Sequence, residues 1–134
     1  MKALEIKVQL QFDAKMIARY RERITQLQQG VGAHAASHEL VQGGMHGDRV
    51  ADAACNILQL KAHMQRHVNN ISSHMALLDT TLPRKIIHLR YIEGLDWEAI
   101  SIKLQYSKAH LYRSHRQAMI AIAAKLATLP KPLA

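Results

Sequence analysis

Apolar residues recur at alternating spacings of four and three positions through the first 80 residues of the chain. Two series follow this heptad pattern: Ile6, Leu10, Asp13, Ile17, Tyr20, Ile24 and Leu27, and then Val50, Ala54, Ile57, Lys61, Met64, Val68, Ile71, Met75 and Leu78. Only Asp13 and Lys61 interrupt the apolar seams, where they can fix the register or pair with each other. Sustained heptads are typical of coiled coils. The pattern therefore predicts two long helices, at about 3–29 and about 48–79, packed as an antiparallel hairpin.

A second pattern overlaps the start of the first predicted helix. The apolar residues Leu4, Ile6, Val8, Leu10 and Phe12 alternate with polar ones, which is typical of a β-strand. A strand needs a partner to be stable, and the sequence shows no second strand. The uninterrupted heptad series therefore favours a helix, with a strand as the alternative.

The connection between the two heptad series is rich in glycine. Five of the six glycines lie in residues 30–48. Glycine favours turns and mobility, so we expect a flexible connection here, in which residues 34–41 can form a short helix. Asp48 is expected to cap the second long helix.

The rest of the chain changes to shorter helical segments with brief breaks between them. The spacing predicts three helices, at about 82–93, 97–104 and 108–128. Gly94 ends the first, and Gln105-Tyr106 separates the second from the third. A short helix, a tight turn and a longer basic helix form a helix-turn-helix, which presents one helix to the DNA major groove.

Residues that can cap helices stand directly before these segments. The candidate caps are Thr80 or Thr81, Asp96 and Ser107. The apolar positions predict a three-helix core of Leu89, Leu95, Ile100, Leu104, Leu111, Met119, Ile122 and Leu126. The predicted fold class is therefore all-α, with a coiled-coil-like helical hairpin in residues 1–80, a helix-turn-helix domain in 81–128 and a tail in 129–134.

Positive charge is concentrated in the second part of the chain. Residues 1–80 hold nine Lys/Arg and seven Asp/Glu, whereas residues 81–134 hold nine and three, and no acid follows Glu98. Such a field attracts a polyanion. The short chain, its single Cys and the lack of a long apolar run exclude a large enzyme core, an internal disulfide and a membrane span. The N-terminus also lacks the features of a signal peptide.

Metal and catalytic chemistry find little support in the sequence. The candidate metal ligands are the pair His34 and His38 and the group Cys55, His63 and His67. Zinc needs three or four converging ligands, and neither a CxxC nor an HExxH motif is present. A P-loop, a GxGxxG loop and a hydrolase triad are also absent. We therefore expect no enzyme activity and no cofactor, while metal binding by these residues stays open.

The last predicted helix carries the basic residues best placed for DNA. Its polar positions are Lys108, His110, Tyr112, Arg113, His115 and Arg116. Residues near the start of such a helix reach base edges, and Arg113 can grip guanine through two hydrogen bonds. The candidates for phosphate contact are Arg90, Trp97, Lys103 and Arg116. For Trp97, packing against the core is an equal alternative.

The segment LRYIEGLDWEAISIKLQYSKAHLYRSHRQAM resembles the fourth region of bacterial sigma factors, which reads the −35 promoter element. With the internal segment GGMHGDRVADAACNI, most of the chain resembles phage late-gene transcription regulators of the RinA/ArpU-like type. The resemblance implies sequence-specific DNA binding near a promoter, with base reading by Lys108, Ala109, His110, Tyr112 and Arg113.

Three positions depart from that pattern. Gln105 stands where a turn glycine is common, which implies a strained or differently shaped turn. Ala109 replaces a base-contacting acid, so the promoter sequence would not be the standard one. Ser114 replaces a core aliphatic residue, which would loosen the last helix.

These observations predict a DNA-binding transcription regulator, a phage-type activator of late genes in the cytoplasm of a bacterial host cell. Its expected partners are double-stranded DNA and further copies of itself, bound through the N-terminal helices, with RNA polymerase as a further candidate and no membrane. Two alternatives remain. One is a DNA packaging protein similar to small terminase subunits, and the other is a coiled-coil interaction factor that acts on RNA polymerase. The DNA target and the choice between activator and repressor stay open.

Overall fold

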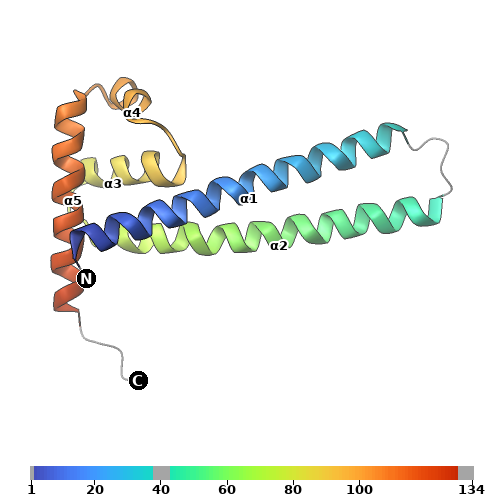
Figure 1. Cartoon of the computed structure of the whole chain (residues 1–134), viewed down its shortest axis with the longest axis horizontal. Helices are drawn as coiled ribbons and strands as arrows, with labels where there is room; N and C mark the ends of the chain where they lie inside the picture. Colours follow the sequence, from blue (N-terminus) through green and yellow to red (C-terminus); the bar gives the residue numbers. More distant parts are fainter. Residues whose placement is uncertain (1, 38–42, 130–134) are drawn as a thin grey trace. The chain divides into compact units, whose positions relative to one another are not determined.

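The computed structural model describes the backbone of residues 2–37 and 43–129, and the side chains of these residues outside 31–50. The elements are α1 (Ala3–Ser37), α2 (Gly43–Met75), α3 (Thr81–Ile87), the π-helical turn η2 (His88–Ile92), α4 (Trp97–Leu104) and α5 (Lys108–Thr128) (Figure 1). The described residues contain no strand, so the all-α prediction is confirmed.

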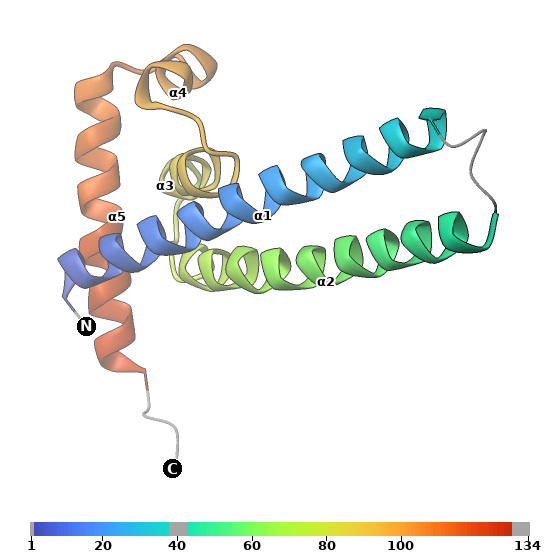
Figure 2. The ribbon, with the colours of Figure 1, turned by 45° about the vertical axis from the view of Figure 1, so that its right-hand side comes forward.

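Contacts divide the chain into two compact units. Unit 1 comprises Met1–Lys15 and Val68–Ala134, and unit 2 comprises Met16–His67. The long helices α1 and α2 each contribute to both units and run in opposite directions (Figure 2). The helices α3, α4 and α5 therefore share one compact unit with the first turns of α1 and the last turns of α2.

The first heptad series marks the buried side of α1. All seven of its positions are buried or half-buried, and Ile6 and Leu10 are fully enclosed. The other members of the strand-like alternation, Leu4, Val8 and Phe12, are more than half exposed. The strand alternative is wrong, because the heptad continues through this segment and gives the helix a continuous apolar side.

The two polar residues in the seams differ in their surroundings. Asp13 is buried in unit 1, where its Oδ1 accepts a hydrogen bond from Asn70 Nδ2 at 3.4 Å. Lys61 lies in unit 2 and is exposed. A buried carboxylate with an amide partner is suited to fixing the register of two helices.

The glycine-rich connection is shorter than predicted. α1 continues past residue 29 to Ser37, and α2 begins at Gly43 instead of 48. A single glycine costs a helix only about 1 kcal/mol relative to alanine, so neighbouring helix-forming residues can carry the helix through it. Asp48 consequently lies inside α2 and not at the position before its first residue, so the prediction of an N-cap at Asp48 is wrong. Residues 38–42, the rest of the expected connection, lie outside the described residues.

The end of α2 and the following helix also differ from the prediction. α2 ends at Met75, four residues early, and a turn closes with a 3.0 Å bond from the Leu78 amide to the Met75 carbonyl. The helix predicted at 82–93 is an α-helix only to Ile87. Thr80 occupies the N-cap position of α3 but its side chain makes no capping bond.

The π-helical turn η2 replaces the last turn of that predicted helix. The Glu93 amide donates to the His88 carbonyl at 3.0 Å, five residues back. Gly94 then adopts a φ of 76°, which glycine tolerates without strain, and the chain turns towards α4. Hydrophobic periodicity carries no signal for a single π-turn, which is a common feature of functional sites.

The boundaries of α4 and α5 agree with the prediction to the residue. Asp96 Oδ1 accepts a hydrogen bond from the Ala99 amide at 2.8 Å, and Ser107 Oγ accepts one from the His110 amide at 3.2 Å. Both predicted caps are therefore confirmed. Between the two helices, the backbone of Gln105 adopts the left-handed helical conformation, with φ 60° and ψ 39°. This is the position where the resemblance implied a strained turn.

A buried aliphatic cluster joins the short helices of unit 1. Its members are Ile86, Leu89, Ile100 and Leu111, with Leu82, Leu95, Trp97 and Leu104 packed against it. All eight residues of the predicted three-helix core are buried or half-buried. Ile86 and Ile87, which the sequence analysis did not include, are fully enclosed. This core fixes the orientation of α4 and α5 within unit 1.

Candidate nucleic-acid interface

One side of α5 is built to face outward. Lys108, Ala109, Tyr112, Arg113 and Arg116 are all exposed. The opposite side is buried and consists of Leu111, Ser114, His115, Ala118, Met119 and Ile122. With 3.6 residues per turn, the exposed positions form one continuous strip along the first turns of the helix. Four of the five predicted base-reading residues belong to this strip, and His110 is half-buried beside it.

The turn before α5 is held by side chains as well as by the backbone. Ser101 Oγ donates to the Tyr106 carbonyl at 2.5 Å, which ties the end of α4 to the turn. The Tyr106 ring stacks on His110, with ring centroids 4.9 Å apart and an angle of 21° between the planes. The first turn of α5 is thus fixed before any ligand binds. Such preorganisation lowers the entropic cost of binding.

Trp97 is the centre of an aromatic group at the start of α4. Its ring meets Tyr112 edge-on at 5.0 Å and His115 edge-on at 5.2 Å. The Arg90 guanidinium lies over the ring, 5.3 Å from its centroid. Trp97 is also packed against the aliphatic cluster, as the core alternative predicted. Its ring therefore positions Arg90 and Tyr112, both of which the sequence analysis selected as DNA contacts.

Arg90 has a structural bond of its own. Its Nη1 donates to the Leu95 carbonyl at 3.0 Å, across the turn at Gly94. This bond and the Trp97 ring fix the guanidinium plane, while the side chain remains only half-buried. A fixed guanidinium with N–H groups to spare is a suitable partner for a phosphate.

His115 does not add to the positive charge of α5. It is buried, and its Nε2 shares a 2.6 Å hydrogen bond with the Tyr91 hydroxyl. Burial, together with the positive charges of Lys7 and Arg90, lowers the pKa of His115 to about 4. Burial likewise raises the pKa of Tyr91 to about 12. Both side chains are therefore neutral at pH 7 and form part of the core.

A groove of about 620 Å³ runs along one flank of the exposed strip. Its wall includes three cations, Lys7, Arg90 and Arg116. The other lining residues are Ala3, Leu4, Gln11, Tyr91, Trp97, Tyr112, His115, Met119 and Ile120. No acidic residue of the described chain lines this groove. We refer to it below as the basic groove.

A second hollow, of about 570 Å³, lies along the other flank of the strip. Its walls are formed by Thr80, Leu82, Pro83, His110, Arg113, Ser114 and Gln117. The outward strip of α5 is consequently a ridge between two hollows. An α-helix with its side chains is about 10–12 Å across, which is comparable with the width of the B-DNA major groove, about 12 Å.

The predicted phosphate contacts do not all come together. Arg90, Trp97 and Arg116 line the basic groove. Lys103 lies elsewhere on α4, exposed, with its Nζ 3.9 Å from the Glu93 carboxylate. The structure also brings Lys7 and Gln11 of α1 into the basic groove. No local sequence signal identifies these two residues, because only tertiary packing places them beside α5.

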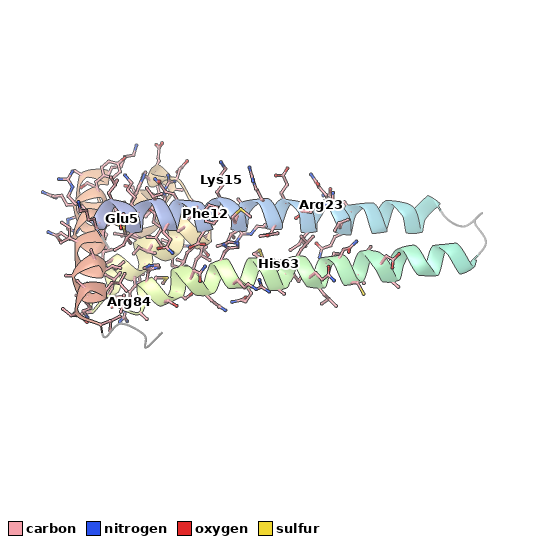
Figure 3. All side chains as sticks on the ribbon, turned by 60° about the horizontal axis from the view of Figure 1, so that its bottom comes forward. Glu5, Phe12, Lys15, Arg23, His63 and Arg84 are labelled. Carbon is pink, nitrogen blue, oxygen red and sulfur yellow. The ribbon has the colours of Figure 1, made fainter. Side chains whose placement is uncertain are left out.

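The candidate metal ligands show no convergence. His63 and His67 both stack on the Tyr20 ring, with centroids 5.8 and 5.9 Å away. His63 and Arg23 line a hollow between α1 and α2 in unit 2 (Figure 3). The described part of the chain contains no group of three or more His, Cys, Asp or Glu placed to hold a metal ion. His34 and His38 lie outside the described side chains.

No protein-family model, curated protein or solved structure matches the chain. Among the described helices, none is both long enough and apolar enough to cross a membrane.

Proposed function

We propose that the protein is a sequence-specific DNA-binding transcription regulator that reads the major groove with α5. The observation that carries this proposal is the outward strip of α5, a basic ridge that begins at a fixed turn and lies between two hollows. In this proposal α3, η2, α4 and α5 form a sigma-like helix-turn-helix, and α1 and α2 form a helical hairpin for association. The resemblance in sequence adds the role of a phage-type late-gene activator in a bacterial host.

Within the ridge, the residues divide by the kind of contact they can make. Arg113 is exposed in the second turn of α5, opposite buried Leu111 and Ala118, and it can reach a guanine edge. Lys108, Ala109, Tyr112 and the half-buried His110 complete the proposed base-reading group. Lys103, Arg90, Trp97 and Arg116 are assigned to phosphates, which set affinity and orientation but not sequence preference.

The test begins with selection of bound duplexes from a randomised DNA library. Affinity is then measured for the selected duplex and for a shuffled one over a salt series. Arg113→Ala should weaken binding to the selected duplex by about 1–3 kcal/mol and leave the shuffled duplex almost unaffected. Lys103→Ala should weaken both alike and reduce the salt slope by about one. Arg66→Ala, an exposed position in unit 2, serves as the charge-matched control.

If selection yields no preferred sequence, the result favours a DNA packaging protein over a transcription regulator. An architectural or packaging role needs salt-sensitive binding without base preference. Equal losses for Arg113→Ala on both duplexes would show that α5 is not the reading helix. Either outcome refutes the proposal at its central claim.

Self-association belongs to the same proposal and is supported by unit 2. Within unit 2, none of the described side chains of α2 is fully buried, and Leu58 is 67 % exposed. A second copy that covers this surface would bury apolar area now in contact with water. Sedimentation at increasing protein concentration should show dimers or larger species, which Leu58→Ser should weaken. A monomer at tens of micromolar would contradict this part of the proposal.

A further inference from the structure

The basic groove contains residues from both ends of the sequence. Lys7 and Gln11 come from the second and third turns of α1, whereas Tyr112 and Arg116 come from α5. Between them in the wall lie Arg90 and Trp97, in the η2 turn and at the start of α4. The position of α1 is fixed here, because Ile6 and Leu10 on either side of Lys7 are fully enclosed. Lys7 is thus held beside the ridge by the core of unit 1.

We propose that the basic groove holds the DNA backbone beside the ridge and that Lys7 contacts a phosphate there. This inference rests on the proposed function and extends the DNA surface from the helix-turn-helix to α1. The α5 residues Tyr112 and Arg116 supply the geometric argument, since both belong to the outward strip and to the wall of the groove.

The dimensions of DNA explain why the two surfaces must act together. An α-helix with its side chains is about 10–12 Å across, and the major groove is about 12 Å wide. A helix seated in that groove therefore has a phosphate backbone close to each flank. On the flank of Tyr112 and Arg116, the space available to that backbone is the basic groove.

The chemistry of the groove suits a phosphodiester. Lys7, Arg90 and Arg116 provide positive charge, and no acidic residue of the described chain lines the wall to oppose it. Gln11 adds a neutral hydrogen-bond donor of a kind that commonly binds phosphate oxygens. His115 also lines the groove, and the positive charges of Lys7 and Arg90 add to the effect of burial in lowering its pKa.

An acidic peptide is the competing occupant, because Leu4, Met119 and Ile120 give the wall an apolar portion. Continuity with the ridge favours DNA. The ridge and the wall of the basic groove share Tyr112 and Arg116. A peptide bound in the groove would therefore compete with the proposed major-groove contact.

The experiment compares Lys7→Ala and Lys7→Glu with the same two changes at Lys15. Lys15 is exposed on α1 within unit 1 but does not line the groove, so it is a matched control. Affinity is measured for the selected and the shuffled duplex over the salt series, with circular dichroism to confirm that each variant keeps its helix content. A peptide of glutamate residues is tested as the second probe.

Lys7→Ala should weaken binding to both duplexes, leave base preference unchanged and reduce the salt slope by about one. Its defect should therefore shrink by about fourfold between about 50 and 200 mM salt. Lys7→Glu should have a larger defect, and both Lys15 variants should bind like the wild type.

The outcomes separate this inference from the function on which it rests. If Arg113→Ala loses base preference while the Lys7 variants match those at Lys15, the regulator proposal stands and the role of the groove is refuted. If the wild-type protein binds neither duplex, both proposals fail. Binding of the glutamate peptide through Lys7, without a Lys7 effect on DNA, would assign the groove to an acidic protein partner and overturn the inference.

Discussion

Unit 1 and unit 2 are both helical, but they are stabilised to different extents by their own side chains. In unit 1, Ile86, Ile100 and Leu111 are fully enclosed in a cluster that joins α3, α4 and α5. In unit 2, α1 contributes buried Ile17 and Ile24, whereas the described side chains of α2 are at most half-buried. Unit 1 thus has an enclosed core, whereas the α1 and α2 segments of unit 2 pack along a single seam.

The difference bears on where function can be placed. A binding surface needs side chains held in fixed positions, and the core and capped helices of unit 1 provide them. A seam that leaves apolar groups half-covered is suited to association with a further chain. The proposed division into a reading unit and an association unit follows from this contrast in packing.

Truncation of the two kinds of core should give clearly different losses of stability. Leu111→Ala leaves a cavity in the enclosed cluster of unit 1 and should lower the free energy of unfolding by about 2–5 kcal/mol. Leu60→Ala removes a half-buried side chain of unit 2 and should cost about 1 kcal/mol or less. Urea unfolding followed by circular dichroism measures both. Equal losses would refute the contrast between the units.

The sequence predicts the parts of the fold that depend on local rules. The heptad seam of α1 is recovered at every position, and the boundaries of α4 and α5 follow from Asp96 and Ser107 as caps. Both features arise within one helix or one turn, where spacing and capping chemistry decide the structure.

The features that the sequence does not predict depend on longer-range balance. Glycines suggest a connection at 30–48, yet the helices continue through most of it. Leu89 and Tyr91 of the π-turn η2 are buried, and hydrophobic spacing does not distinguish such a turn from the last turn of an α-helix. The basic groove needs α1 beside α5, and no local pattern reports that contact. The ridge could therefore be predicted, but the groove beside it could not.

The buried histidine should make unit 1 sensitive to acid. The pKa of His115 is about 4 in the folded protein, against 6.5 for an unperturbed histidine, so the unfolded chain binds more protons between these values. The contribution of neutral His115 is complete above pH 6.5 and is lost as pH falls towards 4, by about 3 kcal/mol. Urea unfolding across this range measures the loss.

Two controls identify the group responsible for that loss. Titration of the His115 ring by NMR should show a neutral imidazole down to about pH 4. His115→Gln, which removes the titrating group, should flatten the dependence of stability on pH between 6.5 and 4. An unchanged slope in this variant would assign the acid sensitivity to other groups.

The cap of α4 should have a smaller effect. Asp96→Ala removes the acceptor of the 2.8 Å bond from the Ala99 amide and should cost about 1 kcal/mol. Asp52→Ala, an exposed position inside α2 in unit 2, removes the same charge without removing a cap. It should be neutral or slightly stabilising, because alanine has the higher helix propensity. Thermal unfolding of the two variants measures the difference, and similar shifts would show that the cap does not stabilise unit 1.

The smallest change in stability is expected for a substitution at Gln105, where the informative result is whether the protein is stabilised or destabilised. A non-glycine residue with φ 60° carries a backbone strain of about 1 kcal/mol or more, which glycine does not have. Gln105→Gly also makes the unfolded chain more flexible, which offsets part of the gain. The net change should be a stabilisation of about 0.5 kcal/mol.

Gln26→Gly, in an exposed turn of α1 in unit 2, should instead destabilise by about 1 kcal/mol, since glycine there interrupts a regular helix. Paired urea unfolding experiments distinguish these signs. A loss at both positions would mean that the turn between α4 and α5 is held by its surroundings without strain, and the preorganised start of the ridge would then not depend on this residue.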